Sequence, residues 1–179
     1  MNRLKTKTFF TILVAIFIFA GTRSYAQDKG FIRYMGEIHT GYGTTSKVKG
    51  IDTYMGRVML GTIQGIALDR YGDVGFGVDG VMLTHYYKDQ GMRFLVNPYL
   101  SVRPSFPLSE KFSFMLDCAL GAYIPVVNME GGKSEFSYEF GGGFKYKRMN
   151  ILVGMQSIGS GDGSITFFAK MGIYLGKQK

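Results

Sequence analysis

The side chains best suited to chemistry are two histidines that fall on the polar face of separate predicted strands. His39 and His85 share that face with the acids Glu37 and Asp79. An imidazole beside a carboxylate can serve as a general acid or base, and two histidines can hold a metal ion. No closely spaced ligand pair accompanies them, and the two strands that carry them are not neighbours. We therefore favour polar packing over a metal site or a catalytic pair.

Other motifs point away from catalysis as well. No nucleophile-elbow sequence surrounds a serine. The glycine-rich segment 159–163 lacks the lysine of a phosphate loop and the spaced acids of a calcium loop. Cys118 is the single cysteine, which excludes an internal disulfide, and it falls on an apolar strand face where it packs as a small hydrophobe. We expect no catalytic residue, no cofactor and no resident metal.

Ten charged residues share the face of the histidines, and their signs nearly balance. Buried charges are tolerated when they pair and accept or donate hydrogen bonds, so the pattern predicts a salt-bridged network inside the fold. Its members are Arg33, Glu37, Arg57, Asp79, Arg93, Arg103, Asp117, Glu139, Lys145 and Lys170.

The segment 92–124 shows which elements would position these charges. Apolar residues occupy every second position from Met92 to Phe106 and again from Phe112 to Ile124. Side chains alternate between the two faces of a strand, so this pattern predicts two antiparallel strands with one apolar and one polar face. Each strand is at least as long as the roughly 9–11 residues with which a tilted strand crosses a bilayer.

The same alternation recurs along the chain and predicts an all-β fold. The 26 glycines, 12 tyrosines and 15 phenylalanines, without sustained helical periodicity, support this class. Strands are expected near 31–43, 51–67, 74–86, 92–106, 112–124, 135–147, 151–158 and 165–175, with the second and seventh alternating least cleanly. An even strand number with tighter connections after the second, fourth and sixth is typical of an eight-stranded up-and-down barrel in the outer membrane.

The first 26 residues are predicted to be a cleaved signal peptide, which leaves 27–179 as one barrel domain. Basic residues precede an apolar stretch of about a dozen residues, which is shorter than the ~20 that a spanning helix needs. Ser24 and Ala26 supply the small residues of a cleavage site. Removing the four basic residues of this segment lowers the formal charge from +8 to +4, which excludes a strongly basic nucleic-acid-binding face.

Two barrel classes fit the alternation, and they differ in where the apolar face points. A soluble lipocalin-like barrel would turn it inward, but eight strands enclose a space that these large side chains would overfill. The chain also has no tryptophan, so the Gly-x-Trp strand signature is missing. We therefore expect the apolar face outward in the outer membrane of a Gram-negative bacterium, with interfacial tyrosines at 42, 54, 71, 86, 123 and 146.

The hairpin at 92–124 also carries a family resemblance. It resembles the central hairpin of PorT-like outer-membrane barrels, which are broadly similar to the OmpA and OmpX barrels, in the residues Leu95, Pro98, Leu100, Phe106, Pro107, Leu108, Lys111, Gly121 and Tyr123. The resemblance implies eight strands and no shared catalytic residues. Pro98 and Pro104 lack the N–H that a ladder requires, so bulges or strand ends must accommodate them.

The leading functional hypothesis is a monomeric structural or interaction protein of the cell envelope, embedded in the lipid bilayer. Its loops would meet an envelope or surface protein, and no nucleic acid is expected. One alternative is a narrow, porin-like channel for small or amphipathic solutes. The other is a membrane-embedded enzyme that modifies lipid or peptide, with His39 and His85 as its weak candidates.

Overall fold

A computed structural model describes residues 32–45, 55–84, 93–127, 134–158 and 164–175. The predicted signal peptide at 1–26, His85 and the glycine-rich segment 159–163 lie outside these described residues. Across the described residues, no helix is long and apolar enough to cross a membrane.

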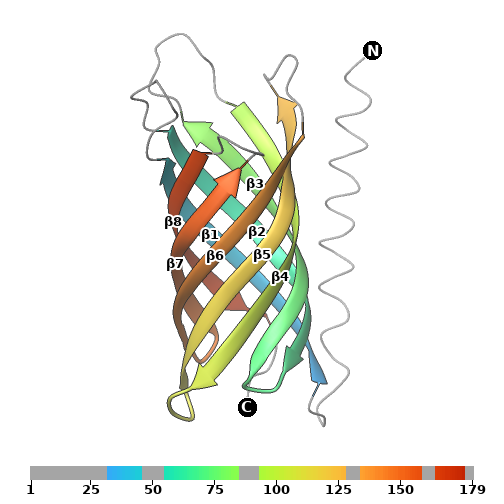
Figure 1. The fold of residues 1–179 in the computed structure, drawn as a ribbon. Helices are drawn as coiled ribbons and strands as arrows, with labels where there is room; N and C mark the ends of the chain where they lie inside the picture. The colour runs from blue at the N-terminus through green and yellow to red at the C-terminus, as the bar shows by residue number, and fades with distance from the viewer. Residues whose placement is uncertain (1–31, 46–54, 85–92, 128–133, 159–163, 176–179) are drawn as a thin grey trace.

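Eight antiparallel strands close into a barrel in which each strand pairs with the next and the first pairs with the last (Figure 1). The prediction of an all-β, eight-stranded antiparallel barrel is confirmed. The strands are β1 Ile32–Thr45, β2 Met55–Leu68, β3 Gly72–Thr84, β4 Arg93–Pro107, β5 Phe112–Val127, β6 Glu135–Tyr146, β7 Met149–Ile158 and β8 Ser164–Tyr174. Because the sheet is closed, no strand is left with an unpaired edge.

Three short turns mark one end of the barrel, here called the turn end. They join β2 to β3 at 69–71, β4 to β5 at 108–111, and β6 to β7 at 147–148. The start of β1 and the end of β8 lie at this end too, at the bottom of Figure 1. Asp69 and Lys147 adopt positive φ values of 49° and 51°, which permit the tight reversals. A turn expected at 148–150 is shorter than predicted, because β7 begins at Met149.

β4 contains three prolines, and the two that lie inside the strand, Pro98 and Pro104, are accommodated on one side of it. Pro98 and Pro104 pair in register with Val78 and Gly72 of β3. The pairing between β4 and β5 skips both prolines, and it also shifts register near Phe94. A proline cannot donate to a ladder, so the β5 side loses pairing where each one lies. The barrel stays closed because the intervening residues still pair.

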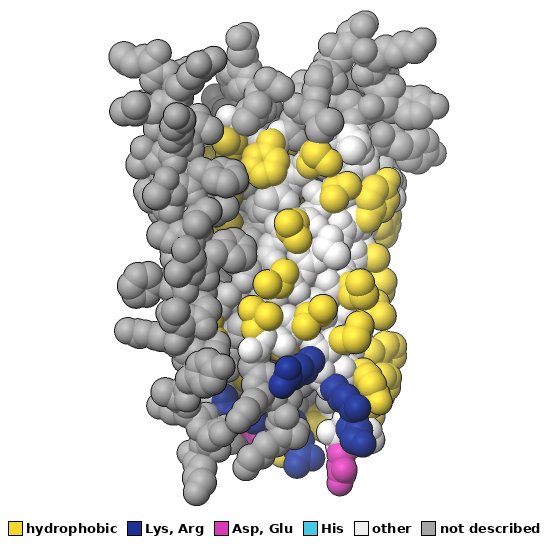
Figure 2. All heavy atoms as spheres, turned by 180° about the vertical axis from the view of Figure 1, so that it is seen from behind, with side chains coloured by type: hydrophobic (Ala, Val, Ile, Leu, Met, Phe, Trp, Pro, Cys, Tyr) yellow, Lys and Arg dark blue, Asp and Glu magenta, His cyan; other side chains and the backbone are white. Residues whose placement is uncertain are grey.

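The outer wall of the barrel is apolar. Figure 2 shows hydrophobic side chains distributed over one face of the wall, with Lys and Arg side chains gathered at the turn end. Leu60 and Leu100 are 64% and 62% exposed, and many other large hydrophobic side chains are about half exposed. Cys118 also faces outward. A water-soluble monomer rarely exposes so much contiguous apolar surface, so the outward orientation of the apolar face is as predicted.

The inner wall is not purely polar. A larger apolar cluster, which the alternation of charges did not reveal, comprises Met59, Val81, Leu83, Leu95, Met115, Tyr123, Leu152 and Phe168. A smaller one comprises Met35, Ile63, Tyr99, Ala119 and Tyr174, with Ala67 packed against it. These side chains pack around the inward-facing charges and fill the barrel.

Candidate functional site

Inward-facing polar side chains form a connected network that draws on every strand. Successive inward positions are two residues apart, so Glu37 and His39 both enter the interior from β1. The other strands contribute Arg57 from β2, Asp79 from β3, Arg103 from β4, Asp117 and Tyr123 from β5, Glu139 from β6, Asn150 and Gln156 from β7, and Lys170 from β8.

The first part of the network is built around Arg103, whose side chain is 1% exposed. Its Nη1 donates to Glu37 Oε2 at 2.6 Å, and its Nε donates to Asp117 Oδ1 at 3.2 Å. Asn150 Nδ2 donates to the same Glu37 oxygen at 2.8 Å, and Ser101 Oγ donates to Asp117 at 2.9 Å. The guanidinium fork therefore bridges two buried carboxylates, which is the geometry that stabilises charges out of water.

The central part joins His39 to two acids. Its Nε2 lies 2.9 Å from Asp79 Oδ1, and its Nδ1 lies 3.5 Å from Glu37 Oε1. The hydroxyl of Tyr99 is 3.4 Å from the same Nε2. Lys170 Nζ then lies 3.7 Å from the second oxygen of Asp79. The imidazole thus connects the Arg103 group to the Lys170 group.

The third part begins at Glu139, which receives Lys170 Nζ on both carboxylate oxygens at 2.7 and 2.8 Å. Gln156 Nε2 donates to Glu139 at 3.1 Å, and the Tyr123 hydroxyl donates to Gln156 Oε1 at 2.7 Å. The guanidinium carbon of Arg57 lies 5.9 Å from the centre of the Tyr123 ring. The interactions therefore continue without a break from Asp117 to Arg57.

A second buried acid group lies near the turn end and was missed by sequence reasoning. Asp73 is 3% exposed and accepts a hydrogen bond from the Tyr174 hydroxyl at 3.0 Å. Lys145 Nζ lies 4.0 Å from the centre of the Tyr174 ring. The predicted strand begins at residue 74 and leaves Asp73 out, whereas β3 begins at Gly72. Because Val74 faces outward, strand parity alone would have placed Asp73 inside.

The ten predicted charges do not share one environment. Seven are buried in the interior, and Lys145 is half-buried beside Tyr174. Arg33 instead pairs with Asp69 at the turn end, where both side chains are partly exposed. The side chain of Arg93 lies outside the described residues.

The prediction of an interfacial position is wrong for Tyr123. Tyr123 is 3% exposed and lies inside the barrel, where Gln156 accepts its hydrogen bond. Its strand parity placed it on the polar face, and parity outweighs proximity to a strand end. Tyr42, Tyr71 and Tyr146 are exposed on the outside, while positions 54 and 86 lie outside the described residues.

The chemistry open to this network is limited by its packing. In the described part of the chain, no group of three or more His, Cys, Asp or Glu side chains is arranged to hold a metal ion. Among the described residues, Nε and Nη1 of Arg57 make no hydrogen bond, and the guanidinium lies over the Tyr123 ring. His39 is 2% exposed and enclosed by its polar partners. Within the described strands, these contacts join side chains of all eight strands and brace the barrel wall.

Glycines on the inner wall show how tightly the interior is filled. A β-carbon added to Gly61 would lie 2.1 Å from Asp79 Oδ1, and one added to Gly77 would lie 2.3 Å from the Tyr99 ring. At Gly41, a β-carbon would approach Lys170 to 2.8 Å. These distances are shorter than real β-carbon contacts, so the neighbouring side chains already occupy the space. Eight strands enclose a volume that side chains just fill, and this barrel follows that rule.

Comparisons with known proteins identify the fold. No protein-family model matches the sequence, and no curated protein matches it. Among solved structures, the outer membrane enzyme PagL superposes with a TM-score of 0.53 at 12% identity, covering 76% of this chain and 98% of PagL. Neisserial surface protein A superposes with a TM-score of 0.51 at 13% identity, covering 81% of this chain and 99% of that protein. The chain therefore has the fold of small eight-stranded outer-membrane barrels.

Proposed function

We propose that this protein spans the outer membrane as a sealed barrel with a structural or interaction role in the envelope. The observation that carries the proposal is the pairing of an apolar outer wall with a filled, hydrogen-bonded interior. The outer wall matches the lipid-facing band of a transmembrane barrel. With the turn end in the periplasm, the longer connections at 46–54, 85–92 and 128–134 would face outward and meet a partner.

We further propose that the barrel conducts no solute. A path along its axis would have to displace Arg103, Lys170 and the carboxylates that hold them. Breaking such buried pairs costs about 3–5 kcal/mol each, so a spontaneous opening would be rare. Kinship with the PorT-like group and a monomeric state remain part of this proposal.

We also propose that the protein is not an enzyme. The likeness to PagL concerns the fold alone, and His39 is held between Asp79 and Glu37 instead of facing a cleft. A catalytic base must come within hydrogen-bond reach of a substrate proton. The enclosed position of His39 gives a substrate no such approach.

Cell fractionation tests the proposed location. The full chain should sediment with the outer membrane, and an unboiled sample should migrate anomalously on a denaturing gel. The matched control lacks residues 1–26 and should remain in the cytoplasm. Recovery of the full chain from the soluble periplasm would refute the membrane proposal and favour a lipocalin-like protein.

A planar bilayer tests the sealed interior. The refolded barrel should produce no reproducible single-channel steps, and its record should match that of a sample unfolded in the same detergent. Steps of constant amplitude in the folded sample alone would favour the channel. A lipid- or peptide-modifying activity that His39→Gln abolishes without unfolding the barrel would favour the enzyme.

A further inference from the structure

Two turns at the turn end lie side by side and bring three cations together. The Lys147 N–H donates to the Lys111 carbonyl at 3.0 Å, which ties the β6–β7 turn to the β4–β5 turn. Lys111, Lys147 and Arg148 are all exposed and together form what we call the cationic rim. Glu110 is the one acid in these two turns. The rim therefore carries a net positive charge.

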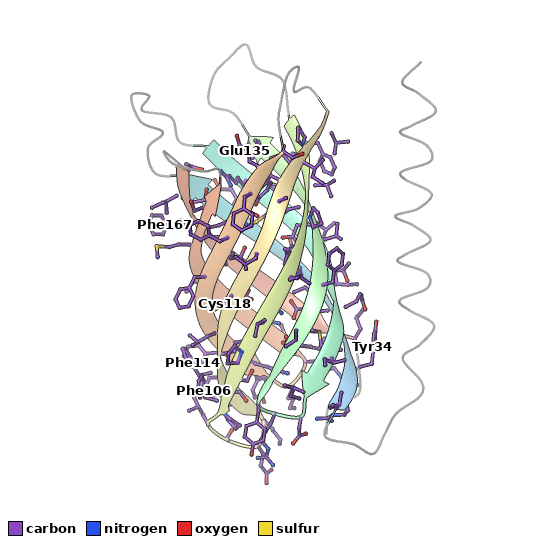
Figure 3. All side chains as sticks on the ribbon, turned by 45° about the vertical axis from the view of Figure 1, so that its right-hand side comes forward. Tyr34, Phe106, Phe114, Cys118, Glu135 and Phe167 are labelled. Carbon is purple, nitrogen blue, oxygen red and sulfur yellow. The ribbon has the colours of Figure 1, made fainter. Side chains whose placement is uncertain are left out.

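An aromatic surface lies directly next to the cationic rim on the outer wall. The rings of Phe112 and Phe144 stack with centroids 5.2 Å apart, and Phe114 meets Phe144 edge-on at 5.7 Å. Phe106 continues the row, 6.2 Å from Phe114. Figure 3 shows Phe106 and Phe114 on the outside of the barrel wall near the turn end. We call these four rings the aromatic ledge.

Lys147 holds a backbone conformation that its side chain does not favour. Its φ of 51° lies in the left-handed region, where glycine fits with least strain and asparagine is favoured next. The chain places a lysine there, and its Nζ lies 5.4 Å from the centre of the Tyr146 ring. A strained non-glycine position is a reason to look for function.

We propose that the cationic rim and the aromatic ledge together bind an anionic glycerophospholipid. The rim would receive the phosphate of the headgroup, and the ledge would lie against the acyl chains. Lysine and arginine bind phosphate through charge-assisted hydrogen bonds, and aromatic girdles sit where headgroups meet hydrocarbon. This inference rests on the proposed membrane location.

The position of the site argues for a phospholipid over the phosphates of lipid A. Short turns of outer-membrane barrels face the periplasm. The inner leaflet there is built of glycerophospholipids, whereas lipid A occupies the outer leaflet. Phosphatidylglycerol and cardiolipin supply the required negative charge together with two or more acyl chains.

The absence of tryptophan from the chain permits a direct test. In Phe112→Trp, the single indole would report on lipids at the ledge. The barrel is refolded into vesicles of phosphatidylcholine and phosphatidylglycerol in which one lipid at a time carries brominated acyl chains. We expect brominated phosphatidylglycerol to quench the indole fluorescence as though this lipid were enriched about fivefold near the indole. The reason is that each Lys or Arg near an anionic lipid surface adds to the attraction between protein and lipid.

Two variants in the Phe112→Trp background separate a site from diffuse attraction. Lys111→Ala with Arg148→Ala should bring the enrichment close to one. Lys147→Gly should lower it while leaving thermal stability unchanged or raised, because glycine suits the positive φ. Arg70→Ala is the matched control, since Arg70 is an exposed cation of the neighbouring β2–β3 turn and lies outside the rim. It should leave the enrichment unchanged.

The outcomes distinguish this inference from the proposed membrane location. Insertion into both lipids with equal quenching would overturn the lipid site and leave the membrane location intact. An equal loss with Arg70→Ala would also overturn it, because diffuse charge would then suffice. If lipid A displaces the brominated phosphatidylglycerol at a lower concentration than unlabelled phosphatidylglycerol does, the site binds lipid A and the proposal of a phospholipid site is overturned. If no brominated lipid quenches the indole fluorescence in any vesicle, the membrane location itself is refuted.

Discussion

The inner and outer faces of the strands are packed differently. An added β-carbon at the inward Gly77 would lie 2.3 Å from the Tyr99 ring, whereas one at the outward Gly142 meets nothing closer than 3.6 Å. Inside, polar groups such as Glu37 and Arg103 pair at short distance, and outside, Leu60 or Leu100 stands exposed. The inner face requires specific partners for each side chain, while the outer face requires mainly apolar character.

The largest contrast is expected from removing one buried charge. Lys170→Met would leave Glu139 and Asp79 without their cation, so the free energy of unfolding should fall by about 3–5 kcal/mol. Urea unfolding in phospholipid vesicles measures this. The exposed cation Arg70 offers a control, since Arg70→Met should change stability by less than about 0.5 kcal/mol. Equal effects at both positions would mean that a charge in the interior network contributes no more to the free energy of unfolding than an exposed charge does.

The outer face should respond to charge according to depth. Leu120 lies near the middle of β5 and is 57% exposed, so Leu120→Arg should cost about 2–4 kcal/mol in a bilayer. Leu108→Arg, in the β4–β5 turn, should cost about 0–1 kcal/mol by the same depth rule. Refolding yield and urea midpoint in vesicles report both. If Leu120→Arg is tolerated as well as Leu108→Arg, the outer wall does not face hydrocarbon.

The glycine pair tests packing directly. Gly77→Ala forces a methyl group against the Tyr99 ring and should destabilise the barrel by about 1–3 kcal/mol. Gly142→Ala has room for its methyl group and should be neutral or stabilise by up to about 1 kcal/mol. Thermal unfolding followed by gel mobility compares the two. Similar melting temperatures for both variants would show that the side chains around Gly77 can move enough to accommodate a methyl group.

The smallest effect is expected where an ion pair reaches solvent. Arg33 and Asp69 are paired at the turn end with side chains 22% and 43% exposed. Such pairs contribute about 0–1 kcal/mol, so Arg33→Ala should barely shift the urea midpoint. Arg103→Ala offers the comparison, because its partners Glu37 and Asp117 are buried. A loss of stability at Arg33 as large as that at Arg103 would show that ion pairs at the turn end and in the interior contribute equally.

Alternation was enough to predict the strands, the strand number and the face on which most charges lie. It also placed Glu37, Asp79, Glu139 and Lys170 together on one face, because parity is a local property of extended backbone. Parity also places Asp73 inside once the strand is extended to Gly72, where β3 begins. The inward position of Gln156 does not stand out in the sequence, because β7 is short and its alternation is not clean.

Which partners meet could not be read from the same pattern. His39 contacts Asp79, which is 40 residues away, and Arg103 contacts Glu37, which is 66 residues away. These pairs depend on the stagger between strands and on closure between β1 and β8. The side on which Pro98 and Pro104 interrupt the ladder could not be read from the sequence either, because it depends on which neighbouring strand faces each proline nitrogen.

Sequence by itself therefore determined the period, the number of strands and the chemical character of each face. Those properties follow from side-chain order along an extended backbone and need no distant contact. The tertiary structure decided that Arg33 pairs with Asp69 at the turn end and that the Tyr123 hydroxyl meets Gln156. It also decided that the Lys147 N–H meets the Lys111 carbonyl next to four phenylalanines. Each of these outcomes depends on the shear of the closed sheet, because shear sets which residues of different strands share a height.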